Sequence, residues 1–99
     1  MRDWTFLTNH SQVLLCVARS AGNHLTAREI AEIVRITERA VQRILDDLEE
    51  AGYISRFRDG RANRYEIHPE RPMRHPAQHG IAIRDLIELL AIPPAQKEP

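Results

Sequence analysis

The sequence predicts a mainly α-helical fold with one small β-hairpin (α+β), and three observations support this class. Apolar residues recur at intervals of three and four in several segments, which is the period of an amphipathic helix. The clearest of these segments, residues 37–52, has a helix-start residue in Thr37 and a helix-stop residue in Gly52. After it, the pair Asp59-Gly60 separates two runs of alternating residues, a pattern typical of a β-hairpin.

The composition bounds the class of protein. The 99 residues are 42% hydrophobic and 28% charged, as in an ordinary single domain. The one cysteine, Cys16, excludes an intrachain disulfide framework and fits a reducing compartment. No apolar run is long enough to span a bilayer, and residues 1–4 lack a signal-peptide pattern. We therefore expect a cytoplasmic protein with no membrane partner.

The formal net charge is zero, but the charges are unevenly distributed. Four arginines and a single acid lie between Tyr53 and Tyr65, a local excess of three positive charges. Among the basic residues only Lys97 is a lysine, and arginine is the better residue for bidentate contacts to phosphate or guanine. A neutral chain with one basic face can bind a nucleic acid, with strong salt dependence.

The N-terminal third predicts an apolar cluster followed by a helix. Trp4, Phe6 and Leu7 precede the helix and are expected to pack on a neighbouring element or a partner subunit. Asn9 or Ser11 can cap this helix, which should end near residue 21, before a Gly-Asn stop signal. Its inner stripe comprises Val13, Leu14, Val17 and Ala18, with Leu15 and Cys16 nearby.

Residues 24–36 predict a short second helix and a tight turn. Residues 24–26 can pair as a small strand, and Thr26 with Glu29 forms a capping box for the helix that follows. The connection Arg35-Ile36 then leads directly to Thr37, with Ile36 expected to anchor the turn in the core. Helix, short turn and capped helix match the helix-turn-helix pattern, and a plain helical hairpin is the alternative.

The helix at residues 37–51 divides its charges in an unusual way. Its apolar stripe points to the core, while Arg39 and Arg43 point away from that stripe and Gln42 flanks them. The arginines precede the acids along the helix, which opposes the helix dipole. Contact with phosphates and base edges would explain the arginines. The acids can orient arginines at the base of the hairpin or repel a misplaced phosphate. The stripe comprises Val41, Ile44, Leu45 and Leu48, and the acids are Asp46, Asp47, Glu49 and Glu50.

The hairpin is expected over residues 53–67, with its turn at 59–62. Ile54 should face the core, and by parity Arg56 and Arg58 lie on the same side. A bulge, or the end of core contact, must therefore release these two arginines to solvent. On the second strand Tyr65 and Ile67 share one face and Arg64 takes the other.

The C-terminal third predicts a linker and a last helix. The domain should span residues 1–69, a proline-rich linker 70–80, the last helix 81–92 and a flexible tail 93–99. The helix has an apolar stripe that needs a partner, so we expect dimerisation; packing on the first helix of the same chain is the alternative. The stripe comprises Ile83, Leu86, Ile87 and Leu90, widened by Ile81, Leu89 and Ile92.

The order of these elements resembles that of the winged helix-turn-helix transcriptional regulators of bacteria and archaea, of the MarR/ArsR-like kind. Residues 25–31, 36–43 and 45–54 carry the resemblance, which covers roughly residues 10–68. The most specific motif is Leu-x-x-Leu-Glu-x-x-Gly and two apolar residues, at 45–54. It leads from the recognition helix into the hairpin, which is called the wing in this family.

The resemblance implies a sequence-specific regulator that binds double-stranded DNA as a homodimer. The helix 37–51 would read the major groove, and the wing 53–67 would contact the DNA backbone or minor groove. The implied DNA contacts are Thr37, Arg39, Gln42 and Arg43 on the helix, and Arg56, Arg58, Arg61, Asn63 and Arg64 on the wing. The expected dimer interface comprises Trp4, Phe6, Ile83, Leu86, Ile87 and Leu90. Larger members add helices for dimerisation and effector binding, for which this chain has little room, and this departure argues against an internal small-molecule pocket.

Other functions have less support. No catalytic constellation or cofactor motif is present, so we expect neither an enzyme nor a bound cofactor. Cys16 is expected as a buried apolar residue, and His75 and His79 lack the further ligands of a metal site. The exposed arginines could instead form surface ion pairs or protect strand edges. The alternative function is a winged-helix protein-interaction module, or a nucleic-acid binder without sequence preference.

Overall fold

The computed structural model describes residues 4–20, 25–60 and 62–91. In chain order they form helix α1 (Asn9–Arg19), helix α2 (Ala27–Val34), helix α3 (Glu38–Glu50), strand β1 (Ile54–Asp59), strand β2 (Ala62–Ile67), a short 3-10 helix η1 (Pro76–Gln78) and helix α4 (Ile83–Leu90). The mainly α fold with one antiparallel hairpin is therefore confirmed. No helix within these ranges has the length and apolar character needed to cross a membrane.

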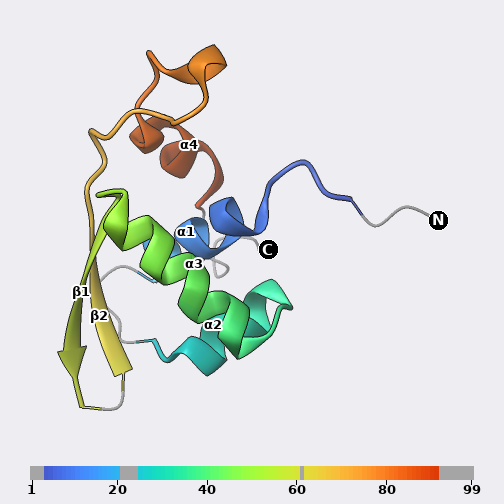
Figure 1. Ribbon diagram of the computed structural model, residues 1–99, viewed down its shortest axis with the longest axis vertical. Helices are drawn as coiled ribbons and strands as arrows, with labels where there is room; N and C mark the ends of the chain where they lie inside the picture. Colours follow the sequence, from blue (N-terminus) through green and yellow to red (C-terminus); the bar gives the residue numbers. More distant parts are fainter. Residues whose placement is uncertain (1–3, 21–24, 61, 92–99) are drawn as a thin grey trace, which may run out of the picture.

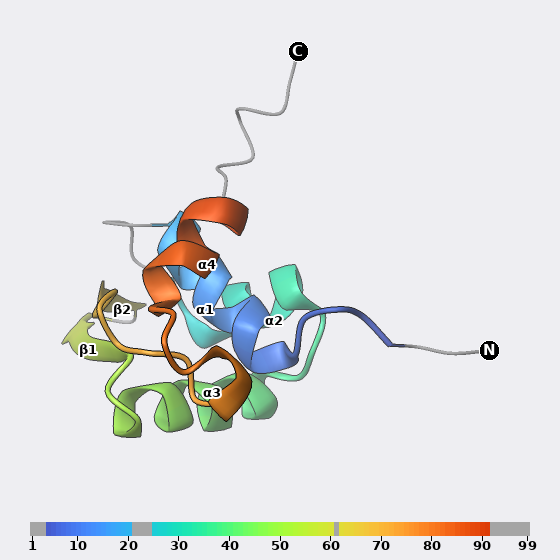
Figure 2. The ribbon, with the colours of Figure 1, turned by 90° about the horizontal axis from the view of Figure 1, so that it is seen from above.

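The helices surround α1, and the hairpin extends from one side of the helical body (Figure 1). α4 lies over α1 on the side away from α3, so α1 is sandwiched between them (Figure 2). Five consecutive residues of α1, Val13–Val17, are buried because both sides of this helix are covered. The largest fully buried side chains come from α1, α2, α3 and β1: Val13, Ile30, Val41, Leu45 and Ile54. Ile36 packs against this core, as predicted for the turn.

The cap of α1 differs from the prediction. Thr8, rather than Asn9 or Ser11, is the N-cap, and its Oγ1 accepts from the backbone N–H of Ser11 at 3.2 Å. Three neighbouring residues can each cap a helix, and only the one with extended backbone does so. The predicted capping box of α2 is confirmed: the Thr26 N–H donates to Glu29 Oε1 at 2.9 Å, and the Glu29 N–H donates to Thr26 Oγ1 at 3.1 Å.

The turn between α2 and α3 contains a residue in the left-handed conformation. Arg35 has φ +69°, and its N–H donates to the Ala31 carbonyl at 2.7 Å, which ends α2. Glycine is the usual residue here, because a side chain costs roughly 1–2 kcal/mol in this conformation. The left-handed conformation of this arginine was not anticipated from the sequence.

The hairpin is regular, so of the two alternatives for its arginines the bulge is wrong, and the end of core contact holds for Arg58 only. Its register runs without interruption from Ile54 opposite Ile67 to Asp59 opposite Ala62. Arg58 is exposed beyond the core, whereas Arg56 stays on the side facing α3. Leu25 exchanges two backbone hydrogen bonds of 3.2 Å with Asn63, which confirms pairing at the middle residue of the predicted 24–26 strand; His24 lies outside the described residues.

The chain after the hairpin folds back on the body instead of forming a simple extended linker. The Met73 N–H donates to the Ile81 carbonyl and the Ile83 N–H to the Arg71 carbonyl, each at 2.9 Å. α4 is shorter than the predicted 81–92 helix, and Ile92 and the tail 93–99 lie outside the described residues. Ile83 is 4% exposed and Ile87 packs on the core, so one face of α4 covers its own chain.

Candidate nucleic-acid interface

α3 presents a polar outer face because its apolar face is fully used by the core. The four stripe residues predicted from the sequence are all at most 7% exposed, and burying such a side chain contributes roughly 1.5–3 kcal/mol. The opposite positions Arg39, Gln42 and Arg43 are all exposed. Thr37 caps the helix, with its Oγ1 accepting from the Ala40 N–H at 3.0 Å. α3 forms one edge of the molecule in Figure 2, so this outer face is accessible.

The end of α3 is closed by backbone and side-chain contacts. Gly52 has φ +86°, and hydrogen bonds run from the Tyr53 N–H to the Leu48 carbonyl (2.9 Å) and from the Gly52 N–H to the Glu49 carbonyl (3.0 Å). This is the arrangement of a Schellman motif. Arg71, which the sequence did not single out, donates from Nη2 to the Ala51 carbonyl at 3.0 Å. It thereby places a positive charge at the negative end of the helix dipole.

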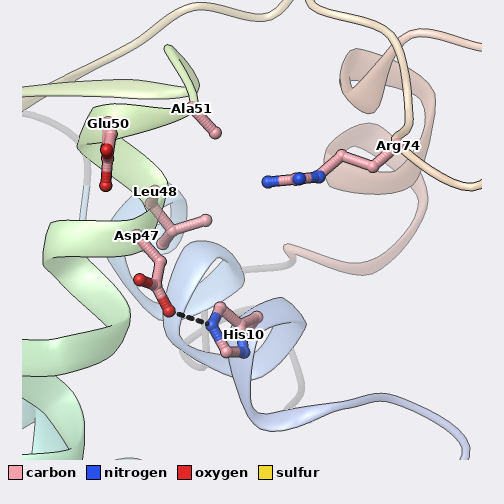
Figure 3. Close-up of a pocket in the computed structure, with 6 residues that line it drawn as sticks. All are labelled: His10, Asp47, Leu48, Glu50, Ala51 and Arg74. Carbon is pink, nitrogen blue, oxygen red and sulfur yellow. Dashed lines mark hydrogen bonds and ion pairs between the residues drawn. The ribbon is translucent and has the colours of Figure 1, made fainter.

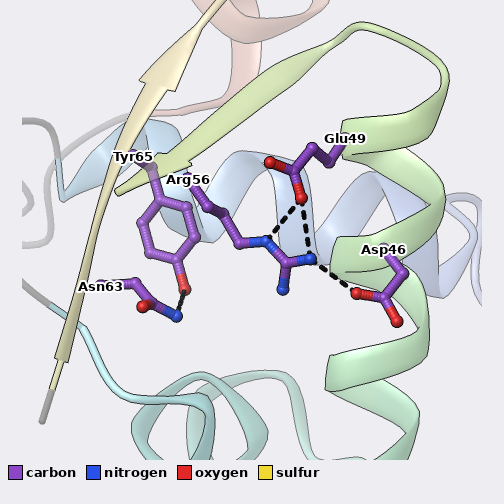
Figure 4. Close-up of polar contacts among 5 residues, drawn as sticks. All are labelled: Asp46, Glu49, Arg56, Asn63 and Tyr65. Atoms are coloured by element: carbon purple, nitrogen blue, oxygen red, sulfur yellow. Dashed lines mark hydrogen bonds and ion pairs between the residues drawn. The ribbon is translucent and has the colours of Figure 1, made fainter. Parts of the chain in front are cut away.

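Arg56 fastens the wing to α3 through two carboxylates (Figure 4). Its Nη2 lies 2.6 Å from Asp46 Oδ1 and 2.9 Å from Glu49 Oε1, and its Nε donates to the same Glu49 oxygen at 3.0 Å. The Arg56 side chain is only 20% exposed. Burial disfavours the charged guanidinium, but the hydrogen bonds to Asp46 and Glu49 outweigh it and raise the pKa of Arg56. We refer to this three-residue contact as the wing clamp.

The residues beside the wing clamp belong to the core side of the hairpin. Tyr65 lies next to Arg56 in Figure 4, and burial raises the pKa of its hydroxyl. The Asn63 Nδ2 donates to Tyr65 Oη at 3.4 Å. Asn63 is therefore half-buried and engaged with its own chain through both side chain and backbone.

Two further arginines of the wing, Arg58 and Arg64, lie on its opposite faces. Arg58 shares the α3-facing side with Arg56 but lies nearer the tip and is exposed. Arg64 is on the outer face, opposite Phe57, with its guanidinium carbon 5.1 Å from the centre of the Phe57 ring. This cation–π contact limits the positions that the Arg64 side chain can adopt. Arg61 lies outside the described residues.

A hollow of about 550 Å³ lies between the start of α1, the end of α3 and the chain after the hairpin (Figure 3). His10 Nε2 lies 2.8 Å from Asp47 Oδ2 across it, a contact between residues 37 positions apart. Both side chains are half exposed, and nothing in the local sequence indicated this pair. A second hollow of about 500 Å³ adjoins it, and both are lined by Glu50, Ala51 and Arg74.

The other candidate side chains have structural roles within the described residues. Cys16 is buried, and burial raises the pKa of its thiol, so it is the apolar core residue predicted. His75 accepts from the Ala77 N–H at 3.0 Å, and His68 Nε2 lies 2.7 Å from Ser55 Oγ. Residues 4–20, 25–60 and 62–91 contain no cluster of three His, Cys, Asp or Glu side chains suited to a metal.

Comparison with known proteins gives three results. The model of the MarR family matches residues 5–64, from the segment before α1 to β2. The uncharacterized protein MJ1254 of Methanocaldococcus jannaschii is 31% identical over 67 residues, which cover 68% of this chain but only 14% of that protein. The structure of CymR, the global cysteine regulator of B. subtilis, superposes with a TM-score of 0.55 at 14% identity. That superposition covers 88% of this chain and 98% of CymR and shows a shared winged-helix fold.

Proposed function

This chain belongs to the MarR family of DNA-binding transcriptional regulators, and we propose that it reads one DNA half-site with α3 and the wing. α3 would enter the major groove, and the wing would contact the backbone or minor groove. The observation that carries the proposal is the outer face of α3, on which Arg39, Gln42 and Arg43 are all exposed to solvent.

The side chains of this face suit base edges. Arginine can donate two hydrogen bonds to guanine, and glutamine can pair with adenine in the same groove. Thr37 lies at the start of α3, where backbone N–H groups and the helix dipole favour a phosphate. These four residues are therefore the proposed contacts of the helix.

The wing clamp reduces the repulsion that the acids of α3 would exert on DNA phosphates. Four carboxylates in the second half of α3 would repel a phosphate backbone. Asp46 and Glu49 are paired with Arg56, so the local negative charge is reduced. We therefore assign Arg56 the role of positioning the wing and propose Arg58, Arg61 and Arg64 as its phosphate contacts. Asn63 is a secondary contact at most, since Tyr65 and Leu25 already engage it.

We also propose that the regulator is a homodimer, because paired half-site contacts raise both affinity and specificity. Trp4 and Phe6 are 64% and 92% exposed, and Leu90 is 41% exposed. These residues, with the half-buried Leu86, stay in the proposed interface. Ile83 and Ile87 leave it, because Ile83 is buried and Ile87 packs on the core of its own chain.

Charge reversal on α3 tests the proposed reading face. The variant Arg39→Glu/Arg43→Glu should lose at least about 30-fold in affinity for a selected DNA site, since each base contact contributes roughly 1–3 kcal/mol. Fluorescence anisotropy with labelled DNA measures the affinity, and circular dichroism checks that the fold is unchanged. The matched control Arg74→Glu/Arg84→Glu makes the same charge change at exposed positions outside α3 and the wing. Equal losses in the two variants would contradict the assignment.

A further inference from the structure

Two carboxylates of α3 lie within reach of Arg43, one of the proposed DNA contacts. Asp46 and Asp47 follow it by three and four positions, and side chains at these spacings are neighbours on a helix surface, with about 5–6 Å between their Cβ atoms. Glu49 and Glu50 are six and seven positions away, outside this spacing. Either aspartate could therefore form an ion pair with Arg43 and compete with DNA for its guanidinium group.

Neither of these two ion pairs is formed. Among the residues that the structure describes, no ion pair includes Arg43, and its side chain is exposed. Asp46 Oδ1 accepts from Arg56 Nη2 at 2.6 Å in the wing clamp (Figure 4). Asp47 Oδ2 lies 2.8 Å from His10 Nε2 (Figure 3). Each aspartate near Arg43 is thus engaged by a residue of another element, β1 or α1.

The two contacts hold the aspartates on opposite sides of Arg43. Successive residues of an α-helix are about 100° apart around its axis, and by this period Arg43 lies between Asp46 and Asp47. Figure 4 shows Asp46 directed toward the wing, whereas Figure 3 shows Asp47 directed toward α1. The carboxylates are therefore kept beside the Arg43 position rather than over it.

Arg74 is the other cation near Asp47. It lines the same hollow as His10 and Asp47, and in Figure 3 its side chain extends toward α3 from the opposite side. No ion pair joins Arg74 to Asp47 within the described part of the chain. Arg43 is on the same helix as Asp47, at a spacing that the helix fixes, so Arg43 is the cation that Asp47 can reach without any change in the backbone.

We propose that His10 is a positioning residue for DNA recognition, which holds the Asp47 carboxylate away from Arg43 and so keeps the Arg43 guanidinium available to DNA. Arg56 does the same for Asp46 from the wing. This role rests on the proposed function, since it requires Arg43 to contact DNA. His10 itself need not touch the DNA, because it acts through Asp47.

A double-mutant cycle on DNA affinity tests this role. His10→Ala should weaken binding to a selected site about twofold at low ionic strength, the size expected of one exposed ion pair four positions apart. Asp47→Ala should keep or raise the affinity, because it removes the competing carboxylate. The variant His10→Ala/Asp47→Ala should bind like Asp47→Ala. Replicate anisotropy titrations measure these affinities, and an equal cost of His10→Ala with and without Asp47 would overturn the proposal.

A second cycle replaces Arg43. In the Arg43→Ala background, His10→Ala should weaken DNA binding no further, whereas a merely structural role of His10 would lower the affinity in both backgrounds. His10→Gln should restore the parental affinity, because its amide can still donate to Asp47. The control His79→Ala removes an exposed histidine that lines the adjoining hollow and should leave the affinity unchanged. Equal losses in His79→Ala and His10→Ala would refute the role of His10.

The single variants separate this role from the proposed function. If Arg43→Ala weakens DNA binding and His10→Ala does not, the DNA contact of Arg43 stands and the role of His10 is refuted. Transfer of Asp47 to Arg74 would give the same result. If Arg43→Ala changes neither affinity nor base preference, Arg43 is not a DNA contact, and both its assignment and the role of His10 fail.

Discussion

Arg56 is the residue whose role depends most on contacts that cross the fold. The parity of the strand correctly placed it on the side of Ile54, which suggested a bulge or the end of core contact because a lone arginine should not face a core. Instead, Asp46 and Glu49 of α3 contact it, ten and seven positions away in the chain, respectively. The alternation of side chains along β1 could be predicted from the sequence, whereas the distance between α3 and β1 could not.

Removing Arg56 should therefore lower stability as well as DNA affinity. Arg56→Ala should reduce the free energy of unfolding by about 1 kcal/mol, a modest value because Asp46 and Glu49 are partly exposed and screened by solvent. Urea unfolding measures it. Arg58→Ala is the control, since exposed Arg58 should change stability by less than about 0.5 kcal/mol. Equal midpoints for the two variants would contradict the wing clamp.

Gly52 combines a left-handed backbone with a close neighbour. A Cβ at this position would lie 2.9 Å from Arg71 Nη2, and φ is +86°. Gly52→Ala should therefore destabilise the fold by roughly 1–2 kcal/mol. Gly60→Ala, at φ +70° with nothing within 4 Å of the added Cβ, isolates the backbone cost and should lose less. Thermal unfolding compares the two; a larger loss at Gly60 would contradict the role assigned to Arg71.

At the scale of elements, the helices and the hairpin follow from local patterns. The capping box at Thr26, the stripe of α3 and the Asp-Gly turn each involve residues close in the chain, and each was predicted correctly. The boundaries of α4 and the cap of α1 were less accurate, because several neighbouring residues could serve equally well. The left-handed Arg35 violates the usual glycine preference and could not be expected from propensity.

Contacts between elements also explain the charge order of α3, in which arginines precede acids. Acids near the end of a helix oppose its dipole by roughly 0.3–1 kcal/mol each. Arg56 pairs with two of these acids, and Arg71 donates to the Ala51 carbonyl just beyond the helix. The unfavourable charges are thus compensated by arginines that also fix the wing and the following chain against α3.

The proposed phosphate contacts of the wing can be tested through the salt dependence of DNA binding. Arg64→Ala should weaken binding to all DNA sequences alike and lower the salt slope by about one, as expected for a lost phosphate contact. Phe57→Leu removes the aromatic ring beneath Arg64 and should give a smaller uniform loss. Titrations at several salt concentrations measure both effects. A loss confined to one base position would instead assign Arg64 a base contact.

At the scale of the whole molecule, the sequence located the proposed DNA-binding face but not the contacts that support it. The outer face of α3 follows directly from its helical period. The His10–Asp47 pair, the wing clamp and the packing of α4 on α1 join distant segments, so only the folded chain shows them. These contacts fix α3, the wing and α4 as one body around α1.

Hydroxyl-radical footprinting on a DNA fragment selected from a genomic library by the purified protein tests the central claim most directly. We expect two protected half-sites related by two-fold symmetry, with centres about one helical turn (~10 base pairs) or a multiple apart. Protection should disappear in Arg39→Glu/Arg43→Glu and persist in Arg74→Glu/Arg84→Glu. Uniform protection without a preferred sequence, or a footprint unaffected by the α3 variant, would contradict the account.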